Sequence, residues 1–356
     1  MQIFDNKTIL ITGGTGSLGK VLTRRLLSCK LGTPKKIIIF SRDEAKQHYM
    51  RLDYQCKKSA TDEVIYDNFH QLLEFRIGDV RDYSSVLSVV KNSDYVINAA
   101  ALKQVPSCEY FPFEAVKTNI IGAENIVRAI REGNAKVKAV VGVSTDKACK
   151  PVNVMGMTKS IQERIFIGAN ILCPNTRFIC VRYGNVLASR GSVIPLFFEQ
   201  IKNGGPVTIT TKEMTRFLLT LNKAVDIVFS ALQNANPGEI FIPKVPSSLI
   251  YNIAKALIGD KKINIEFIGI RPGEKIHETL ISKEESFRTY DKKNYLVIKP
   301  LLPEIFKSEE GLEPIKKEYN SANAVMNFEE TEEMLKENNL LDYKTLQIDD
   351  ESELLI

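Results

Sequence analysis

The sequence predicts an α/β fold with a doubly wound parallel sheet and a smaller C-terminal region. Three observations support this fold class. Short runs rich in β-branched residues alternate with longer stretches of helical periodicity, as expected of successive βαβ units. The short runs are almost entirely apolar, which is typical of strands that helices cover on both faces. A glycine-rich turn joins the first run to the first helical stretch, where such sheets bind phosphate groups.

The predicted elements follow one another along the chain. Strands are expected at residues 8–12, 36–40, 73–77, 95–99, 137–143 and 177–182. Helices are expected at residues 17–27, 113–132 and 157–169. Residues 43–72 should hold further helices, because a structureless connection of that length would be unusual. After Gly184 the pattern becomes irregular, which predicts that a second region starts there.

The composition excludes several classes of protein. With 44% hydrophobic and 26% charged residues, the 356-residue chain has ample material for a core, so extensive disorder is excluded. No apolar run is long enough for a membrane span or a signal peptide, so a cytoplasmic protein without a membrane partner is expected. The cysteines form no CxxC pair and the three histidines stand far apart, so no metal site is predicted.

The charges are unevenly distributed. From Leu301 onward, 15 acidic residues face 5 basic ones, so the body of the chain is basic although the net charge is only +5. The basic residues are dispersed rather than gathered in a run, which favours small anionic ligands such as nucleotides and predicts no nucleic-acid partner.

The glycine-rich turn predicts a dinucleotide site of the Rossmann type. Gly13 can make the tight turn, Gly16 lets the backbone approach a pyrophosphate, and Gly19 lets the helix pack closely on the strand. The following helix N-terminus offers free N–H groups to the anion. The residues expected to contact the cofactor here are Thr12, Gly13, Thr15, Gly16, Ser17, Leu18 and Gly19.

The end of the second strand indicates which dinucleotide is bound. A carboxylate that binds the ribose 2′-hydroxyl of NAD usually stands there, but this chain has Arg42, with Ser41 and Lys46 nearby. A guanidinium favours a 2′-phosphate, so NADP is expected rather than NAD; Asp43 offers the alternative of a ribose contact. Further cofactor contacts are expected after the third and fourth strands, at Asp79, Val80, Ala99, Ala100 and Ala101, and the alternative for Asp79 is a helix cap.

The motifs together carry a family resemblance. With Asn98-Ala99-Ala100-Ala101, Ser144-Thr145-Asp146-Lys147 and a helical Lys159, the chain resembles an extended short-chain dehydrogenase/reductase. Residues 100–106 (AALKQVP), 182–186 (RYGNV), 189–195 (SRGSVIP) and 271–275 (RPGEK) narrow the resemblance to the UDP-N-acetylglucosamine 4,6-dehydratases of bacterial surface-glycan biosynthesis. The resemblance extends from about residue 5 to about residue 300.

This resemblance implies an activity and a domain organisation. UDP-N-acetylglucosamine would be oxidised at C4, lose water across C5 and C6, and be reduced at C6, to give a UDP-4-keto-6-deoxy-N-acetylhexosamine. Residues 1–183 would form the NADP-binding domain, rejoined by about 214–242. Residues 184–213 and 243–306 would bind the UDP-sugar, and 307–356 would be an acidic tail. A homo-oligomer, dimer or hexamer, is also implied.

The resemblance also assigns roles to single residues. Thr145 would bind the sugar hydroxyl, Asp146 would be the acid at C6, Lys147 the base at C5, and Lys159 would bind the nicotinamide ribose. The family pattern YxxxK normally supplies a tyrosine that takes the sugar hydroxyl proton, but this chain has Met155, which cannot titrate. The chain therefore resembles the subset of these dehydratases that carries methionine at this position. The acid/base work at C4 must therefore fall to Thr145 with a water or to the Asp146 and Lys147 pair.

Contacts to the UDP moiety are implied further along the chain. The matching positions are Asn185, Val193, Ile194, Pro195, Arg271 and Glu274. Lys103, Arg190 and Arg216 are additional candidates for the sugar or the phosphates, and a structural ion pair is the alternative for each.

Two other functions stay open from the sequence. A UDP-sugar 4-epimerase shares the fold, but that chemistry uses the tyrosine that Met155 replaces and needs no acid/base pair after the fifth strand. A non-catalytic NADP-binding scaffold would explain Met155, but the intact Asp146, Lys147 and Lys159 argue against it.

Overall fold

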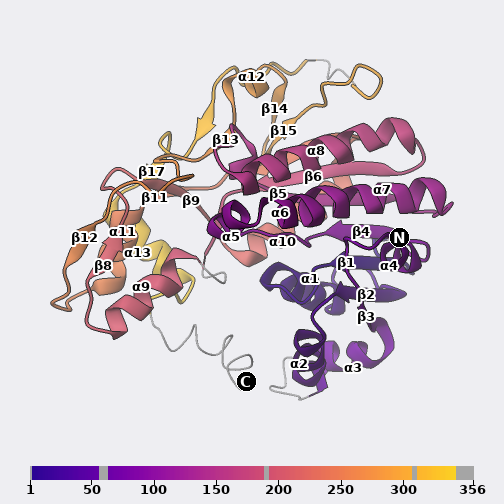
Figure 1. The fold of residues 1–356 in the computed structure, drawn as a ribbon, viewed down its shortest axis with the longest axis horizontal. Helices are drawn as coiled ribbons and strands as arrows, with labels where there is room; N and C mark the ends of the chain where they lie inside the picture. Colours follow the sequence, from indigo (N-terminus) through magenta and orange to yellow (C-terminus); the bar gives the residue numbers. More distant parts are fainter. Residues whose placement is uncertain (1, 56–62, 188–191, 307–310, 342–356) are drawn as a thin grey trace.

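A nine-stranded sheet forms the centre of the molecule in the computed structural model, which describes residues 2–55, 63–187, 192–306 and 311–341 (Figure 1). In spatial order its strands are β14 (Thr289–Lys292), β15 (Tyr295–Ile298), β10 (Ile240–Pro243), β6 (Arg177–Tyr183), β5 (Ala139–Thr145), β4 (Tyr95–Asn98), β1 (Thr8–Thr12), β2 (Lys36–Ser41) and β3 (Leu73–Ile77). The seven strands from β10 to β3 are parallel, and the β14–β15 hairpin adds an antiparallel edge. The strand order reverses between β1 and β4, which is where such sheets bind ligands. The doubly wound parallel sheet predicted from the sequence is confirmed.

Helices cover both faces of this sheet. One face carries α1 (Ser17–Leu27), α3 (Glu63–Leu72) and α10 (Leu221–Asn234), and the other carries α4 (Tyr83–Val90), α7 (Gly122–Glu132) and α8 (Val154–Leu172). All five residues of β1 are buried between the layers, which explains its central run of isoleucine and leucine. The helices predicted within residues 43–72 are also confirmed, as α2 (Glu44–Gln55) and α3.

The helix predicted at 113–132 is interrupted in the structure. It consists of α6 (Pro112–Ala115), a π-helical segment η2 (Val116–Ile121) and α7, and it follows the short helix α5 (Val105–Tyr110). Asn119 of the π-helical segment is fully buried; its amide nitrogen donates to the Leu102 carbonyl (3.0 Å) and to Thr158 Oγ1 (3.0 Å), and its amide oxygen accepts from the Leu102 N–H (2.9 Å). The π-helical turn therefore anchors the loop after β4, a common use of such turns near functional sites.

A smaller lobe lies at the left of Figure 1. It has a four-stranded sheet and a separate apolar cluster to which α9, α11 and α13 contribute. Its elements are β7 (Asn185–Val186), α9 (Val193–Lys202), β8 (Val207–Ile209), β9 (Thr215–Leu219), β11 (Ser247–Leu249), α11 (Ile250–Ile258), β12 (Ile265–Phe267), β17 (Val325–Met326) and α13 (Phe328–Glu337). The remaining elements are η3 (Asp146–Ala148), β13 (Thr279–Ile281), α12 (Lys283–Ser286) and β16 (Tyr319–Asn320). β13 pairs with β16 and contacts η3, and α12 contacts β14 of the main sheet.

The main sheet and the smaller lobe both contain segments that the sequence assigned elsewhere. The hairpin β14–β15, which falls in the predicted UDP-sugar region 243–306, belongs to the main sheet. The predicted acidic tail 307–356 is built into the fold over its described part, because β16, β17 and α13 all pair or pack there. Acidic residues occupy the exposed side of α13, whereas Thr331 and Leu335 are fully buried. The helix is therefore amphipathic, which the net negative charge of this segment does not indicate.

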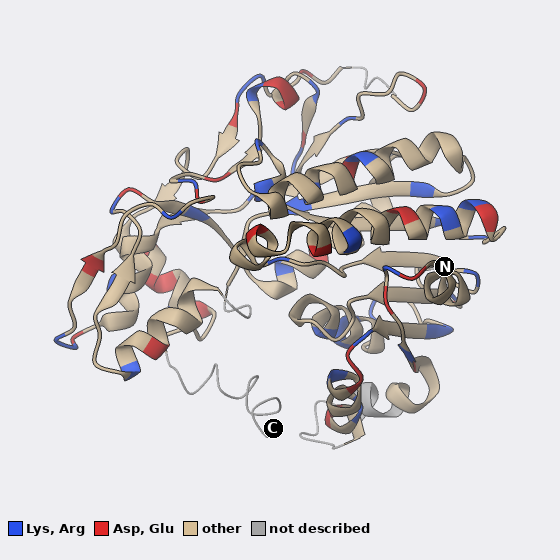
Figure 2. Ribbon diagram, viewed as in Figure 1, with Lys and Arg blue, Asp and Glu red and all other residues tan. Residues whose placement is uncertain are grey.

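Charged residues of both signs are interspersed over the molecule. Figure 2 shows basic and acidic positions following one another along α7 and α8. Among the described residues, no helix combines the length and the apolarity that a membrane crossing would need.

Candidate active site

A cleft of about 1520 Å³ runs along the carboxyl ends of the parallel strands and continues onto the smaller lobe. One end is lined by the turn after β1 and by Arg24 and Asp53, and the other by Arg271 and Glu274. A site for one drug-sized ligand occupies about 300–1,000 Å³. The cleft is therefore large enough for two ligands side by side, and its position at the reversal of strand order is the one expected of a dinucleotide site.

The turn after β1 needs glycine at two positions. Gly13 has a φ of +64°, and a Cβ there would lie 2.8 Å from the Ala100 backbone. A Cβ on Gly19 would lie 2.3 Å from the Gly14 carbonyl oxygen, so α1 packs directly on the turn. No side chain of the described residues caps the N-terminus of α1, which leaves backbone N–H groups available to an anion in the cleft. Of the predicted contacts in this turn, only Thr12 does not line the cleft: it is buried, and its hydroxyl donates to Asn98 Oδ1 (2.6 Å).

The residues after β2 lie at the same end of the cleft. Ser41, Arg42 and Lys46 line it, and Thr15 Oγ1 lies 2.9 Å from Ser41 Oγ, which joins this segment to the glycine turn. The Arg42 side chain is 60% exposed, and its nearest carboxylate is that of Asp79 at 3.9 Å. A guanidinium so loosely paired is available to an anion.

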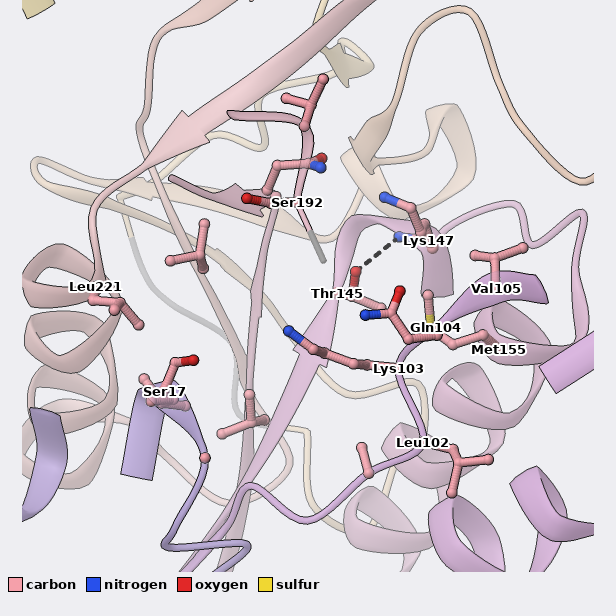
Figure 3. Close-up of a pocket in the computed structure, with 18 of the residues that line it drawn as sticks. Ser17, Leu102, Lys103, Gln104, Val105, Thr145, Lys147, Met155, Ser192 and Leu221 are labelled. Carbon is pink, nitrogen blue, oxygen red and sulfur yellow. Dashed lines mark hydrogen bonds between the residues drawn. The ribbon is translucent and has the colours of Figure 1, made fainter. Parts of the chain in front are cut away.

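Of the cofactor contacts predicted from the sequence, those after β3 do not line the cleft, whereas those after β4 do. Asp79 forms an ion pair with Arg81 (2.6 Å), and Val80 is buried where Gly122 approaches it; neither lines the cleft. Ala99, Ala100 and Ala101 do line it, and so does Lys103. Figure 3 shows the Lys103 side chain extending from the anchored loop after β4 into the cavity.

The wall after β5 brings together Thr145, Asp146 and Lys147. Asp146 is completely buried, and its Oδ1 accepts from Thr145 Oγ1 (2.9 Å) and from Lys147 Nζ (3.1 Å). Lys147 also forms an ion pair with Glu278 Oε1 (3.0 Å), a residue next to β13 that also lines the cleft. The side chains of Thr145 and Lys147 stand next to each other at the cavity in Figure 3. Three ionisable groups and a hydroxyl thus form one hydrogen-bonded cluster.

Burial and charge set the protonation of this cluster. Burial is the largest influence on Asp146 and raises its pKa, which the nearby Lys147 ammonium offsets only in part. Burial would lower the pKa of Lys147, but the charges of Asp146 and Glu278 raise it above its ordinary value. A carboxyl group with a raised pKa is suited to hold a proton and then donate it, which is what a general acid does.

Helix α8 supplies two further residues to the same part of the cleft. Lys159 is buried, and its ammonium donates to the Val143 carbonyl (2.5 Å) and to Gln162 Oε1 (2.7 Å). Burial lowers the pKa of Lys159 to about 8. Met155, one helical turn earlier, is 5% exposed and packs in a small apolar cluster with Cys108 and Ala115.

The residues predicted to contact UDP are only partly brought together. Asn185, Val193, Pro195, Arg216, Arg271 and Glu274 line the cleft. Ile194 is buried in the apolar cluster of the smaller lobe and does not line the cleft, and Arg190 lies outside the described residues. Arg216 donates to the carbonyls of Thr215 and Ile276, so backbone oxygens orient it rather than the ion pair considered from the sequence.

Several residues of the cleft were missed by sequence reasoning. Glu278 and Tyr183 line it, and so do Arg24 and Ser192. The only sequence signal for Glu278 is its position four residues after Glu274, just beyond the RPGEK motif. Within the described part of the chain, four residues of the lining have a buried side-chain oxygen without a hydrogen-bond partner, namely Asp146, Asn185, Ser192 and Glu278. Because buried polar groups are almost always paired, these oxygens indicate a surface prepared for a polar ligand.

The comparison with protein families covers most of the chain. Residues 9–300 match the model of a family described as polysaccharide biosynthesis protein. The chain belongs to this family. A UDP-glucose 4-epimerase of Rickettsia conorii is 48% identical over 298 residues, which are 82% of this chain and 83% of the relative.

Solved structures agree with the fold. The structure of Pen from Bacillus thuringiensis is 35% identical, covers 95% of this chain and 99% of its own, and superposes with a TM-score of 0.84. A dTDP-glucose 4,6-dehydratase from Streptomyces venezuelae, solved with NAD, is 17% identical, covers 76% of this chain and 86% of its own, and has a TM-score of 0.62, a likeness of fold alone. The expected fold is confirmed, whereas the 4,6-dehydratase subset stays a prediction.

Proposed function

We propose that the protein is an NADP-dependent enzyme that converts UDP-N-acetylglucosamine into a UDP-4-keto-6-deoxy-N-acetylhexosamine. The observation that carries this proposal is the buried Asp146 beside Lys147 on one wall of the cleft, with a pKa raised by burial. Elimination of water across C5 and C6 needs a base at C5 and an acid at the leaving C6 hydroxyl, and this cluster offers both groups within hydrogen-bonding distance of each other.

The cofactor would occupy the half of the cleft beside the glycine turn. Its pyrophosphate would meet the free N–H groups of α1, and Arg42 with Lys46 would bind the 2′-phosphate. The buried Lys159 would contact the nicotinamide ribose. When bound, the nicotinamide supplies the chemistry of hydride acceptance from C4 and hydride return to C6.

Side chains of the protein would then carry out the proton transfers. Thr145 Oγ1 would bind the C4 hydroxyl and pass its proton to Asp146 Oδ1, 2.9 Å away. Asp146 would give that proton to the leaving C6 hydroxyl, and Lys147 would remove the proton from C5 and later return it. Asp146 would donate to the C6 hydroxyl the same proton that it accepted from the C4 hydroxyl, so the enzyme would return to its starting protonation state. Met155 would then need no role in proton transfer.

The UDP moiety would occupy the half of the cleft shared with the smaller lobe. Arg271 is suited to the diphosphate because its planar fork of donors can bind two oxygens at once. The unpartnered oxygens of Asn185 and Ser192 would accept hydrogen bonds from the nucleotide. The predicted homo-oligomer remains part of this proposal.

A UDP-sugar 4-epimerase is the second candidate function, because the 48% identical relative carries the name UDP-glucose 4-epimerase. That reaction moves a proton and a hydride at C4 only. It therefore gives no role to an acid aimed at C6, and the tyrosine position of the family pattern is occupied by Met155.

One incubation separates these functions. The purified protein is incubated with NADP and either UDP-N-acetylglucosamine or UDP-glucose, and the products are followed by mass spectrometry and chromatography. Loss of one water supports the dehydratase, whereas an unchanged mass with a new retention time identifies the epimerase. No change with either sugar would contradict both and favour a scaffold. Lys147→Met is the control, because it should abolish the water loss without emptying the cofactor site.

The choice of NADP is tested at Arg42. Arg42→Ala should weaken NADP binding by about tenfold or more, because a charge-assisted contact to a phosphate is removed, and should leave NAD binding nearly unchanged. Arg24→Ala, at the same end of the cleft, serves as the comparison. Equal losses for NAD and NADP in calorimetric titrations would remove Arg42 from the 2′-phosphate site.

A further inference from the structure

Lys147 is held between two carboxylates rather than one. Its Nζ lies 3.1 Å from Asp146 Oδ1 and 3.0 Å from Glu278 Oε1. Glu278 is 2% exposed and comes from the segment before β13, far from Asp146 in the chain. The fold therefore brings a second buried acid to the proposed base, and the proposed reaction has so far given that acid no role.

The surroundings of Glu278 leave one of its oxygens open. Its Oε2 is buried and has no hydrogen-bond partner among the described residues; the Lys275 ammonium lies 3.9 Å away and donates to the Cys149 carbonyl instead. The neighbouring His277 turns to Thr215 Oγ1 (2.8 Å). Glu278 thus has one oxygen on Lys147 and a second with spare capacity.

The charges around the cluster favour the ionised pair in the resting protein. Burial alone would raise the pKa of Glu278, but Lys147, Arg216 and Lys275 lower it below its ordinary value. On Lys147, the charges of Asp146 and Glu278 outweigh burial and Arg216, so its pKa is raised. Lys147 therefore begins as an ammonium and Glu278 as a carboxylate.

An ammonium cannot remove a proton from C5. Before Lys147 acts as a base it must lose one proton, and that proton needs an acceptor within reach. Asp146 cannot serve, because in the proposed reaction it already holds the proton from C4. Glu278 Oε1 is the remaining acceptor in contact with Lys147 Nζ.

We propose that Glu278 is a positioning residue that activates Lys147: it fixes the lysine at the wall and accepts its proton so that the neutral amine can act at C5. This inference rests on the proposed function. One N–H bond of Lys147 breaks and one O–H bond forms on Glu278, so no proton leaves the cluster. After the amine has taken the C5 proton and returned it, the proton moves back from Glu278 to Lys147.

The first test measures the charge of Lys147 without using catalysis. The protein is acetylated briefly with an N-hydroxysuccinimide ester at several pH values, and mass spectrometry compares Lys147 with the exposed Lys35 of the same molecule. In Glu278→Gln, Lys147 should react about tenfold faster than in the wild type, because removal of one of its two carboxylate partners lowers its pKa. Glu239→Gln removes a buried carboxylate that pairs with Lys299 away from the cleft, and should leave Lys147 unchanged.

The second test follows turnover against pH. Without the acceptor, Lys147 can act only in the minority of molecules that have already released its proton to water at pH 7, so kcat of Glu278→Gln should be about tenfold or more below the wild type at that pH. The kcat of Glu278→Gln divided by that of the wild type should then rise with pH, towards the range where Lys147 becomes reactive to acetylation. The KM of the variant should differ from that of the wild type much less than kcat does. Glu278→Asp, which keeps an acceptor, should recover part of kcat and lose this dependence on pH.

Defined results would overturn the inference. Unchanged Lys147 acetylation in Glu278→Gln, or a kcat ratio that does not vary with pH, excludes the activating role. If Glu278→Gln does not fold, Glu278→Asp and the wild type decide, because a wild-type Lys147 as reactive as Lys35 is incompatible with two carboxylates holding it charged. Failure of the wild type to form product would refute the proposed function, while acetylation would still report on the Glu278 contact.

Discussion

Met155 shows how one residue redirects the chemistry of a site. It occupies the position of the tyrosine in the pattern that the sequence resembles, yet it is enclosed by Cys108 and Ala115 and can only pack against a ligand. The neighbouring wall supplies the ionisable groups instead. The loss of the phenol is therefore compatible with an active enzyme whose proton chemistry is concentrated after β5.

Substitutions at Met155 test this arrangement. Met155→Leu, apolar and of similar volume, should retain substantial turnover. Met155→Tyr introduces a larger polar ring into an enclosed position, which commonly costs about 1–3 kcal/mol, so its turnover should not exceed that of the wild type. Steady-state rates with UDP-N-acetylglucosamine across pH decide the matter. A Met155→Tyr enzyme many times faster than the wild type would show that the native cleft lacks an effective base at C4.

Lys159 should make the stability of the folded protein depend on pH. Its pKa is lowered from 10.5 to about 8 by burial, so between these values the unfolded chain holds a proton that the folded chain has released. The free energy of unfolding must then rise with pH in this window. Relative to Lys159→Met, the wild type should gain about 1–2 kcal/mol between pH 7.5 and 9.5, since each pH unit contributes at most about 1.4 kcal/mol.

Urea titrations without cofactor measure the difference in free energy of unfolding between the wild type and Lys159→Met at each pH. A part of this difference that does not vary with pH reports only the lost hydrogen bonds of Lys159. A difference that does not change with pH would mean that Lys159 titrates normally in the folded protein.

At the scale of elements, the turn between β1 and α1 is shaped by contacts that only glycine permits. The absent Cβ of Gly19 lets α1 start directly on the Gly14 carbonyl, which aims the free N–H groups at the cleft. The π-helical segment positions the loop after β4, because Asn119 is hydrogen-bonded to the backbone of this loop, which carries Lys103. Both devices place backbone and side chains at the same edge of the sheet.

Gly19→Ala tests the first of these devices. Its Cβ would lie 2.3 Å from a carbonyl oxygen, so the turn must shift, and we expect a loss of about 1–3 kcal/mol of stability together with weaker NADPH binding. Gly168→Ala in α8 is the matched control: nothing lies within 4 Å of its Cβ, and it should gain roughly 0.5–1 kcal/mol. Thermal melts and fluorescence titration with NADPH measure both. Undiminished NADPH binding in Gly19→Ala would contradict the tight fit of the turn.

At the scale of the whole molecule, the cleft depends on two lobes that each have their own apolar cluster. The smaller lobe is completed by α13, which packs on α11 although it comes from the acidic end of the chain. The half of the cleft proposed for UDP therefore depends on chain that composition alone describes as a tail.

Leu335→Ala tests whether α13 belongs to the folded lobe. Leu335 is fully buried, and its truncation should destabilise the protein by about 2–5 kcal/mol. Glu333→Ala, exposed on the same helix, should change stability by less than about 0.5 kcal/mol. Denaturant unfolding compares the two. A Leu335→Ala protein as stable as Glu333→Ala would show that the helix is dispensable.

Local pattern was sufficient for the sheet and the cofactor turn. The strands β1, β3 and β6 lie at the predicted positions, and the glycines of the first turn make the close approaches that their spacing indicates. Strands covered on both faces, such as β1 and β6, consist mainly of apolar residues, and a tight turn needs residues without a Cβ, so both leave signals within a few neighbouring residues. The sequence by itself thus determined the fold class and one half of the cleft.

Tertiary structure alone decided which distant groups share that cleft. It placed Glu278 on Lys147, separated Asp79 and Val80 from the cleft, and folded α13 into the smaller lobe. A single carboxylate before a strand has the same sequence signature whether it faces water or a buried ammonium. Contacts between residues far apart in the chain leave no periodic pattern, because they arise only when the sheet and the lobe bring their segments together.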